Sequence, residues 1–179
     1  MSERSAVPPP VTAVLDASSR WLPTRLGEVE DRLGAAIAPF SGSPIGGDAA
    51  ATLAAGGKRL RPMLVLLCAG EAGGEAAVRA ATAIELVHMA TLVHDDVIDQ
   101  APLRRGVPTV AATSGRLRAQ ATGDLLLSRA FALLATAGDA RAVELLAEAS
   151  VALRGASWRS ARTPSTWRST RSATCSAAG

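Results

Sequence analysis

The stretch ATAIELVHMATLVHDDVIDQAPLRR, residues 81–105, decides the fold and the chemistry of this chain. Its first thirteen residues carry a single charge, and three aspartates then follow within five positions. So apolar a segment predicts a buried helix, which we expect over residues 75–99 and which Pro102 ends. Acids that emerge from a buried helix need partners, so this helix end is the first candidate site.

The acidic end of the predicted helix has the spacing of a cation site. On an α-helix Asp95 and Asp99 lie about 6 Å apart along the axis and on nearly the same side, with Asp96 about 100° further round. Carboxylates at this spacing repel one another unless a cation offsets them, and oxygen ligands suit Mg²⁺. His88 lies on the same face, two turns earlier. The alternative is an ordinary solvated acidic helix end.

The segment GGKRLRP, residues 56–62, is the second candidate site. Two glycines permit a sharp turn, and three cations follow within four residues. Lys58, the only lysine of the chain, offers a point charge and Arg61 a bidentate fork, while a helix starting near Pro62 adds its positive end. These features suit a phosphate clamp. The alternative is an ordinary basic loop, and since the spacing is not that of a Walker loop, nucleotide binding is not implied.

Arg104 and Arg105 form the third candidate site. They follow Asp99 by five and six residues across a proline turn, so they could return toward the carboxylates. With Mg²⁺ between them, the acids and the arginines would bind a diphosphate, whose oxygens neither carboxylate could approach unaided. The combination of carboxylates and arginines indicates a diphosphate site more specifically than any of these motifs alone.

The rest of the chain has the pattern of helices with an aliphatic core. Ala and Leu are abundant, and aromatic residues make up 3% with no tyrosine. Leu26, Val29, Leu33 and Ile37 recur at helical spacing after Pro23. We expect loops at 41–48 and 101–115, a mobile segment at 1–22, no strands, and helices at 23–37, 49–55, 62–71, 75–99, 119–136 and 139–153. The predicted fold class is all-α.

Composition and charge exclude several classes of protein. The net charge is +3, but five of the 19 basic residues and none of the 16 acidic ones lie from Arg154 onward, so the first 153 residues carry −2 and indicate no basic groove for nucleic acid. The N-terminus lacks a secretory signal pattern, and the longest apolar run, residues 63–70, is too short to span a membrane. Cys68 and Cys175 make neither a disulfide framework nor a metal spacing. We expect a cytoplasmic protein with no transmembrane segment and no nucleic-acid partner.

Three motifs, in this order, resemble the trans-polyprenyl diphosphate synthase family: GGKRLRP, then ELVHMATLVHDDVIDQAPLRRGVPTV, then GDLLLSRAFALL. The resemblance covers residues 25–153, about the first half of a family domain. It implies an isoprenoid-synthase-type helical bundle, here truncated, that forms a homodimer or a heteromer with a related synthase. It further implies that Lys58, Arg61, His88 and Arg105 hold isopentenyl diphosphate and that Arg104 holds an allylic diphosphate.

The resemblance also implies a metal site and a reaction. Asp95, Asp96 and Asp99 would be the first aspartate-rich motif and bind Mg²⁺, and together with Arg104 they would be the catalytic set. Such an enzyme stabilises the departing diphosphate, forms an allylic cation in a dry cavity and lets the isopentenyl double bond attack it. Ala90, five residues before the first aspartate, occupies the family's chain-length position, where a small residue predicts a longer product. The segment SGRLRAQATGD departs from the family's usual Trp-Gly-Asn and leaves the local packing open.

Residues 154–179 depart from the family pattern altogether. They contain no Asp, Glu, Leu, Ile, Val or Met, so a disordered basic tail is expected. The family's second aspartate-rich motif is absent, and we therefore expect weak or absent activity of this chain. The residues from Ser157 onward can be reverse-translated with GC-rich codons. When that nucleotide sequence is read one nucleotide earlier, it permits an acidic, helical sequence similar to the one that follows this point in family members. Our hypothesis is a frame shift near Arg154 and the alternative a natural tail; an unbroken reading frame on resequencing would contradict the frame shift.

Two other functions remain as alternatives. One is a non-catalytic subunit or inactive fragment that pairs with a full-length synthase, which co-purification would support. The other is a metal-dependent phosphohydrolase, suggested by the His94-Asp95 pair. That function needs further histidine ligands, and since the chain has only two histidines it is the weaker alternative.

Overall fold

The computed structural model describes residues 9–161, which fall into two units, one that ends at Ala140 and one that begins at Arg141. Within the described residues the chain is helical apart from one two-stranded hairpin. The predicted all-α class is therefore confirmed. Every residue predicted for the site lies in the first unit.

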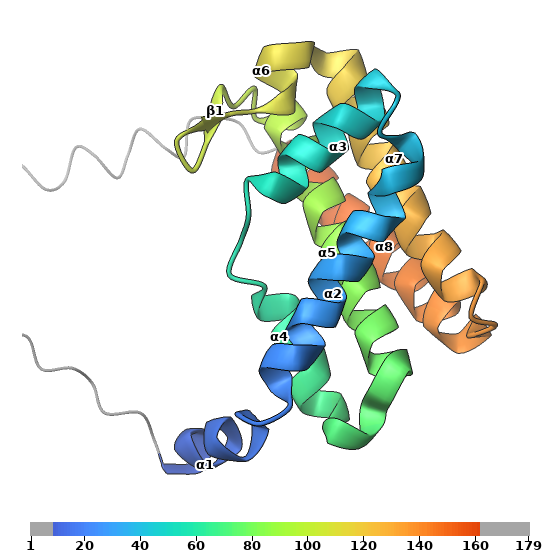
Figure 1. The fold of residues 1–179 in the computed structure, drawn as a ribbon. Helices are drawn as coiled ribbons and strands as arrows, with labels where there is room; N and C mark the ends of the chain where they lie inside the picture. Colours follow the sequence, from blue (N-terminus) through green and yellow to red (C-terminus); the bar gives the residue numbers. More distant parts are fainter. Residues whose placement is uncertain (1–8, 162–179) are drawn as a thin grey trace, which may run out of the picture. The chain divides into compact units, whose positions relative to one another are not determined.

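Helix α5 (Gly74–Ile98) runs through the centre of the first unit (Figure 1). It packs against α7 (Arg116–Ala135), α4 (Leu60–Ala69) and α2 (Leu22–Ile37). Twelve of its residues are buried, including several consecutive ones, so neighbouring elements cover it on most sides. The helix predicted over 75–99 is confirmed to within one residue at each end.

The core of the first unit is aliphatic, as the composition predicts. The largest fully buried side chains include one leucine from each of the four packed helices α2, α4, α5 and α7: Leu33, Leu66, Leu86 and Leu126. Trp21, Phe40 and Phe131 are only half-buried. The spacing of Val29, Leu33 and Ile37 along α2 places all three side chains in this core.

Helix α3 (Pro44–Ala54) begins five residues earlier than predicted, so the loop expected at 41–48 is wrong in its second half. Ser43 caps the helix, because its Oγ accepts a hydrogen bond from the Gly46 backbone N–H at 3.1 Å, and Pro44 occupies the first helical turn. Gly46 serves close packing rather than a turn, since a Cβ there would collide with the carbonyl oxygen of Phe40. Phe40 belongs to a short 3₁₀ turn, η1 (Ala38–Phe40), between α2 and α3.

Helix α4 begins two residues before the predicted start. Arg59 precedes it in the left-handed conformation, with φ 48°, and Gly70 ends it with φ 66°. A 3₁₀ turn, η2 (Glu71–Gly73), leads on to α5. Helix α7 likewise starts three residues before the predicted residue 119.

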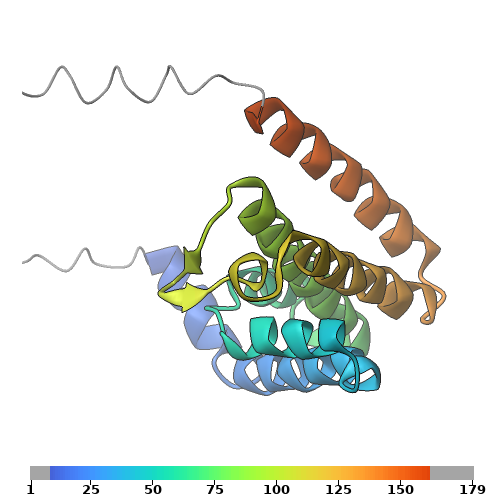
Figure 2. The ribbon, with the colours of Figure 1, turned by 90° about the horizontal axis from the view of Figure 1, so that it is seen from above.

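The predicted loop at 101–115 and the expected absence of strands are wrong. Two short antiparallel strands and a helix occupy this segment: β1 (Leu103–Arg104), β2 (Val107–Pro108) and α6 (Val110–Ser114). Arg105 and Gly106, with φ 54° and 80°, make the tight turn between the strands, because two consecutive positive φ values match the twist of a hairpin. Figure 2 shows the hairpin next to α6 at one end of the unit.

Thr109 ties the hairpin to the elements around it. Its hydroxyl donates to the Ala101 carbonyl at 2.7 Å and accepts from the Ala112 backbone N–H at 3.1 Å, which caps α6. The Thr109 backbone N–H also donates to the Pro102 carbonyl at 3.1 Å. The hairpin therefore returns the chain to the end of α5 in a fixed conformation.

Both ends of the described chain are more helical than predicted. Helix α1 (Pro9–Ser18) replaces much of the mobile segment expected at 1–22, and residues 1–8 lie outside the described part. Helix α8 (Ala140–Ala161) confirms the helix predicted at 139–153 and continues eight residues further, because no proline or glycine run stops it there. The remainder of the predicted disordered tail, residues 162–179, lies outside the described residues.

One helical segment is long and apolar enough to cross a membrane by length and composition. This segment consists of η2 and α5 together, Glu71–Ile98, and is the one found among the described residues. Its 18-residue window has a mean hydropathy of 1.4. That window is 61% buried inside the protein, which is the behaviour of a core helix. The longest uninterrupted apolar run in the sequence, residues 63–70, lies in the shorter helix α4 and its C-cap Gly70.

Candidate functional site

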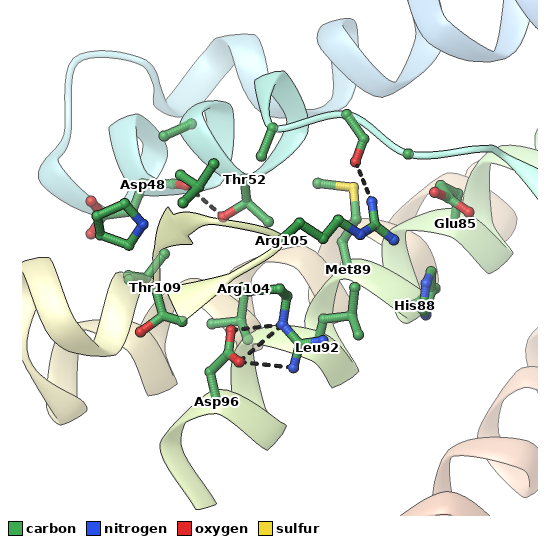
Figure 3. Close-up of a pocket in the computed structure, with 18 of the residues that line it drawn as sticks. Asp48, Thr52, Glu85, His88, Met89, Leu92, Asp96, Arg104, Arg105 and Thr109 are labelled. Carbon is green, nitrogen blue, oxygen red and sulfur yellow. Dashed lines mark hydrogen bonds and ion pairs between the residues drawn. The ribbon is translucent and has the colours of Figure 1, made fainter. Parts of the chain in front are cut away.

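A pocket of about 600 Å³ lies in the first unit between α3, the turn before α4, α5, the hairpin and α6 (Figure 3). Six of the residues predicted for the site line it: Lys58, Arg61, His88, Asp96, Arg104 and Arg105. They come from three segments that are up to 47 residues apart in the sequence, as between Lys58 and Arg105. The fold therefore brings residues from each of the three predicted candidate sites to one cavity.

One side of α5 forms a wall of the pocket. His88, Leu92 and Asp96 follow one another at intervals of four residues, so they lie along one side of the helix, and Glu85 lies one turn before His88 (Figure 3). Glu85 is 4% exposed and Asp96 5% exposed, so two carboxylates are buried on this wall. Each needs a cationic partner in such a place.

The hairpin supplies the partner of Asp96. Arg104 Nε donates to both carboxylate oxygens of Asp96, at 2.9 and 3.1 Å, and Nη2 lies 2.8 Å from Oδ1. This fork arrangement is the strong form of a charge-assisted hydrogen bond. The pair holds the hairpin against the C-terminal end of α5.

Arg105 reaches the opposite side of the pocket. Its Nη1 donates to the Gly56 carbonyl at 3.0 Å, so the hairpin is joined to the turn between α3 and α4 (Figure 3). Gly57 lies directly beside this contact, because a Cβ there would be 3.4 Å from Arg105 Nη1. The two adjacent arginines thus hold two walls of the pocket together.

The basic turn keeps two of its three cations available. Within the described residues, Lys58 and Arg61 have no hydrogen bond or ion pair to another side chain, and both are exposed. Arg59 is different, since it forms ion pairs with Glu30 and Glu85. Lys58 and Arg61 are therefore the cations that a bound anion can use.

His88 faces these cations and is held neutral by its surroundings. Burial is the main reason that the pKa of His88 falls below its ordinary value, and Arg61 lowers it further. Glu85 raises the pKa and Arg105 lowers it, both more weakly. A neutral His88 can donate one hydrogen bond to a phosphate oxygen without adding a charge.

The three predicted metal ligands are not gathered into one cluster. Asp96 is engaged by Arg104, Asp95 and Asp99 do not line the pocket, and no group of three metal-binding side chains converges among the described residues. Burial and then the Asp99 charge raise the pKa of Asp95, and the Arg104 charge offsets part of this effect. Two hard oxygen donors fit Mg²⁺, which often takes one or two carboxylates and completes its shell with water and phosphate oxygens.

His94 points away from the pocket, toward α7. Its Nε2 lies 3.3 Å from the Gln120 carbonyl oxygen and 3.2 Å from Asp124 Oδ1, and Gly123 makes room for the ring. Because its ring nitrogen is committed to α7, His94 does not add a ligand to the pocket. The arrangement gives no support to a phosphohydrolase built on His94 and Asp95.

Ala90 is buried in α5, at 1% exposure, and is not among the residues that line the pocket. The apolar part of the lining near His88 comes instead from Met89, Leu92 and Val93. The role of Ala90 in product length stays a prediction.

Sequence reasoning missed three residues of the site region. Asp48, on α3, lines the pocket and pairs with Arg118, and the Ser114 hydroxyl donates to it at 3.1 Å. Arg59 and Glu85 form the ion pair beneath the basic turn. Glu85 carried a readable signal, because it is the single charge of an otherwise apolar helix segment and so had to have a partner.

The comparisons with known proteins agree on one family. A family model described as polyprenyl synthetase matches residues 46–157, more than half of the chain. The chain is 45% identical over 136 residues to heptaprenyl diphosphate synthase component 2 of Geobacillus stearothermophilus. The matched region covers 75% of this chain and 42% of that protein.

Solved structures give the same result. Geranylgeranyl pyrophosphate synthetase from Pyrococcus horikoshii superposes with a TM-score of 0.67 at 34% identity, covering 80% of this chain and 46% of that one. A polyprenyl synthase from Caulobacter crescentus, solved with calcium and isoprenyl diphosphate, superposes with a TM-score of 0.62 at 33% identity, covering 78% and 42%. The chain spans less than half the length of these relatives.

Proposed function

Because this chain belongs to the polyprenyl synthetase family, we propose that its pocket binds isopentenyl diphosphate and an allylic diphosphate and serves the transfer of a prenyl group between them. One observation carries the proposal. Two unpaired cations, a neutral histidine and the paired arginines of the hairpin meet at one pocket beside the carboxylates of α5. Diphosphates carry several negative charges, which this set of donors can match.

The isopentenyl diphosphate lies on the basic side of the pocket in this proposal. Lys58 and Arg61 bind its phosphate oxygens, His88 donates a hydrogen bond, and Arg105 adds a second fork from the hairpin. The support is that all four side chains line the pocket and that Lys58 and Arg61 have no competing partner among the described residues. The allylic diphosphate lies nearer the end of α5, where Arg104 meets it.

Asp95 and Asp99, joined by Asp96 once Arg104 turns to the ligand, would hold Mg²⁺ at this end of α5. When bound, Mg²⁺ supplies positive charge that neutralises the departing diphosphate. The donor type fits, and the solved Caulobacter relative holds calcium, another cation that prefers oxygen ligands, together with an isoprenyl diphosphate.

The reaction needs no nucleophile from the protein. The allylic carbon–oxygen bond breaks and its electron pair leaves with the diphosphate, whose growing negative charge Arg104 stabilises. The double bond of isopentenyl diphosphate then attacks the allylic carbon, and the proton lost in forming the new double bond passes to the released diphosphate. Met89, Leu92 and Val93 contribute apolar walls that exclude water from the cation.

A labelled-substrate assay tests the transfer. The chain is incubated with Mg²⁺, an allylic diphosphate and radiolabelled isopentenyl diphosphate, and the longer allylic product is extracted and counted. Incorporation that Arg104→Ala abolishes and Arg25→Ala leaves unchanged supports the proposal, because Arg25 pairs with Glu28 on α2 and does not line the pocket. Equal incorporation in the Arg104→Ala protein contradicts it. Product length in this assay tests whether Ala90 gives a longer chain.

A second candidate is a subunit that contributes this pocket to an assembly with a related synthase. The name of the Geobacillus relative, a synthase component 2, favours it. In that case incorporation appears only when a full-length family member is added, and the two chains co-purify. Homodimer formation and a cytoplasmic location stay predictions, which size-exclusion chromatography with light scattering and cell fractionation test.

A further inference from the structure

Arg59 stands out among the cations of the basic turn because of its backbone. It adopts φ 48° and ψ 35° at the start of α4, one of only three non-glycine residues with positive φ in the described part of the chain. A residue with a Cβ disfavours this conformation, so contacts elsewhere have to hold it.

The side chain of Arg59 supplies those contacts. Its Nε and Nη2 donate to the two carboxylate oxygens of Glu30 on α2, the second at 3.2 Å, and its Nη1 donates to Glu85 on α5 at 3.0 Å. The Arg59 side chain is only 13% exposed and that of Glu85 only 5%. Arg59 therefore joins the turn to two helices, through a largely buried ion pair with Glu85 and a more exposed one with Glu30.

The same contacts decide which cations remain for a ligand. Two carboxylates neutralise Arg59, whereas its neighbours Lys58 and Arg61 stay unpaired within the described residues and line the pocket. Gly57 lets this arrangement form, since a Cβ there would be 3.3 Å from Arg59 Nη1.

We propose that Arg59 is a positioning residue, which binds Glu85 and Glu30 and thereby fixes the turn so that Lys58 and Arg61 face the pocket. This inference rests on the proposed function, because it assumes that these two cations bind a diphosphate. Without Arg59 the buried Glu85 carboxylate loses its ion-pair partner, and nothing then holds the turn that carries Lys58 and Arg61 against α5.

Calorimetric titration of the full chain with inorganic diphosphate, without metal, tests the inference. Arg59→Met removes the side-chain contacts, and Arg59→Gly removes them while allowing the left-handed backbone without strain. Both variants are expected to bind about tenfold more weakly, because the cations are misplaced rather than lost. Arg32→Met is the matched control, since Arg32 pairs with Glu75 between the same two helices, away from the pocket.

A second measurement reports position directly. Reductive ¹³C-methylation labels Lys58, the only lysine, and the α-amino group, so one side-chain NMR signal follows the turn. In the wild-type protein and in Arg32→Met, diphosphate is expected to shift this signal. In both Arg59 variants the signal is expected to differ before ligand is added and to need about tenfold more diphosphate to shift.

The outcomes separate this inference from the proposed function. If Lys58→Ala and Arg61→Ala weaken binding but Arg59→Met does not, the positioning role is overturned and the diphosphate site stands. Wild-type affinity in Arg59→Gly also overturns it, since the backbone conformation alone would then suffice. If the wild-type chain does not bind diphosphate at all, both fail. Weakening in the two Arg59 variants, with Arg32→Met unchanged and circular dichroism spectra matching, supports the inference.

Discussion

The charged residues of the pocket divide into pairs and unpaired cations. Asp96 pairs with Arg104 and Glu85 with Arg59, whereas Lys58 is left without a partner among the described residues. Buried carboxylates are stable only with a cation and hydrogen bonds, so these pairs are required by burial itself. Lys58 is then a cation at which we expect a ligand to bind.

His88 provides a prediction on pH at the level of one residue. Its pKa in the free protein lies below the ordinary 6.5, first through burial and then through Arg61, and the negative charge of a bound diphosphate opposes the effect of Arg61. Binding therefore takes up a proton as the pH falls toward 6, which favours binding at lower pH. Calorimetry at pH 6 and 8 should show this gain for the wild-type protein and a smaller one for His88→Gln, a comparison that cancels the ionisation of the ligand.

The effect of pH on the stability of the folded protein runs in the opposite direction from its effect on ligand binding. Because the pKa of His88 is lowered by folding, its contribution to stability is present above pH 6.5 and is lost as the pH falls below that value. The ligand-free wild-type protein should lose more thermal stability than His88→Gln between pH 7 and 5. Identical losses in the two proteins would contradict the burial of a neutral His88.

Asp95 gives a prediction on stability and metal together. Burial and the Asp99 charge raise its pKa, so the ionised carboxylate is disfavoured in the metal-free fold at pH 7. Asp95→Asn should therefore raise the free energy of unfolding by a few tenths of a kcal/mol without metal. Mg²⁺ with diphosphate should raise the melting temperature of the wild-type protein and have little effect on the variant. A variant less stable than the wild type in the absence of metal would contradict this account.

At the scale of elements, the contact of α5 with α7 positions the acidic end of the central helix. Gly123 lets α7 approach the ring of His94, since any Cβ at position 123 would overlap that ring. Gly123→Ala should therefore cost about 1–3 kcal/mol in urea unfolding. Gly27→Ala, in the middle of α2 with open space around it, should be neutral or stabilising by up to about 1 kcal/mol. Equal effects of the two substitutions would show that His94 does not pack against position 123.

The sequence predicts the helices well where the apolar pattern is long. The centre of α5 carries one charge in thirteen residues, and its bounds are predicted to within one residue. Prediction fails at 44–48 and 101–115, where short polar interactions decide the conformation. Ser43 and Thr109 cap helices there, signals that a segment rich in glycine and proline conceals.

Six of the residues predicted for the site line one pocket, whereas their roles stay predictions. Residue type and spacing identify the cations and carboxylates, because diphosphate and Mg²⁺ demand those groups. The pairing of these charges depends on the turn before α4 and on the hairpin. Arg59 in the turn and Arg105 in the hairpin adopt left-handed backbone conformations, which no periodic pattern in the sequence reveals. The Arg59–Glu85 pair and the contact of Asp96 with Arg104 therefore emerge only in three dimensions.

For the first unit as a whole, the proposed function leads us to expect that the Arg104–Asp96 pair couples the binding of metal to that of diphosphate. Arg104 already neutralises Asp96, so Mg²⁺ alone competes with it, whereas a diphosphate draws Arg104 away and adds ligands for the metal. Mg²⁺ should therefore bind at least fivefold more tightly in the presence of inorganic diphosphate, and by linkage the reverse holds. Arg104→Gln should tighten the binding of Mg²⁺ alone and reduce this coupling. Coupling of wild-type size in Arg104→Gln, seen by calorimetry, would contradict this role of the pair.

The proposed function requires above all that this pocket binds isopentenyl diphosphate. The most direct measurement is calorimetric titration of the full chain with isopentenyl diphosphate, repeated with Lys58→Ala/Arg61→Ala and with Arg25→Ala as the control outside the pocket. Saturable binding by the wild-type protein and by Arg25→Ala is expected. The double variant should bind at least tenfold more weakly, because two charge-assisted contacts are lost. Equal binding by all three proteins, or none by the wild type, would contradict the claim.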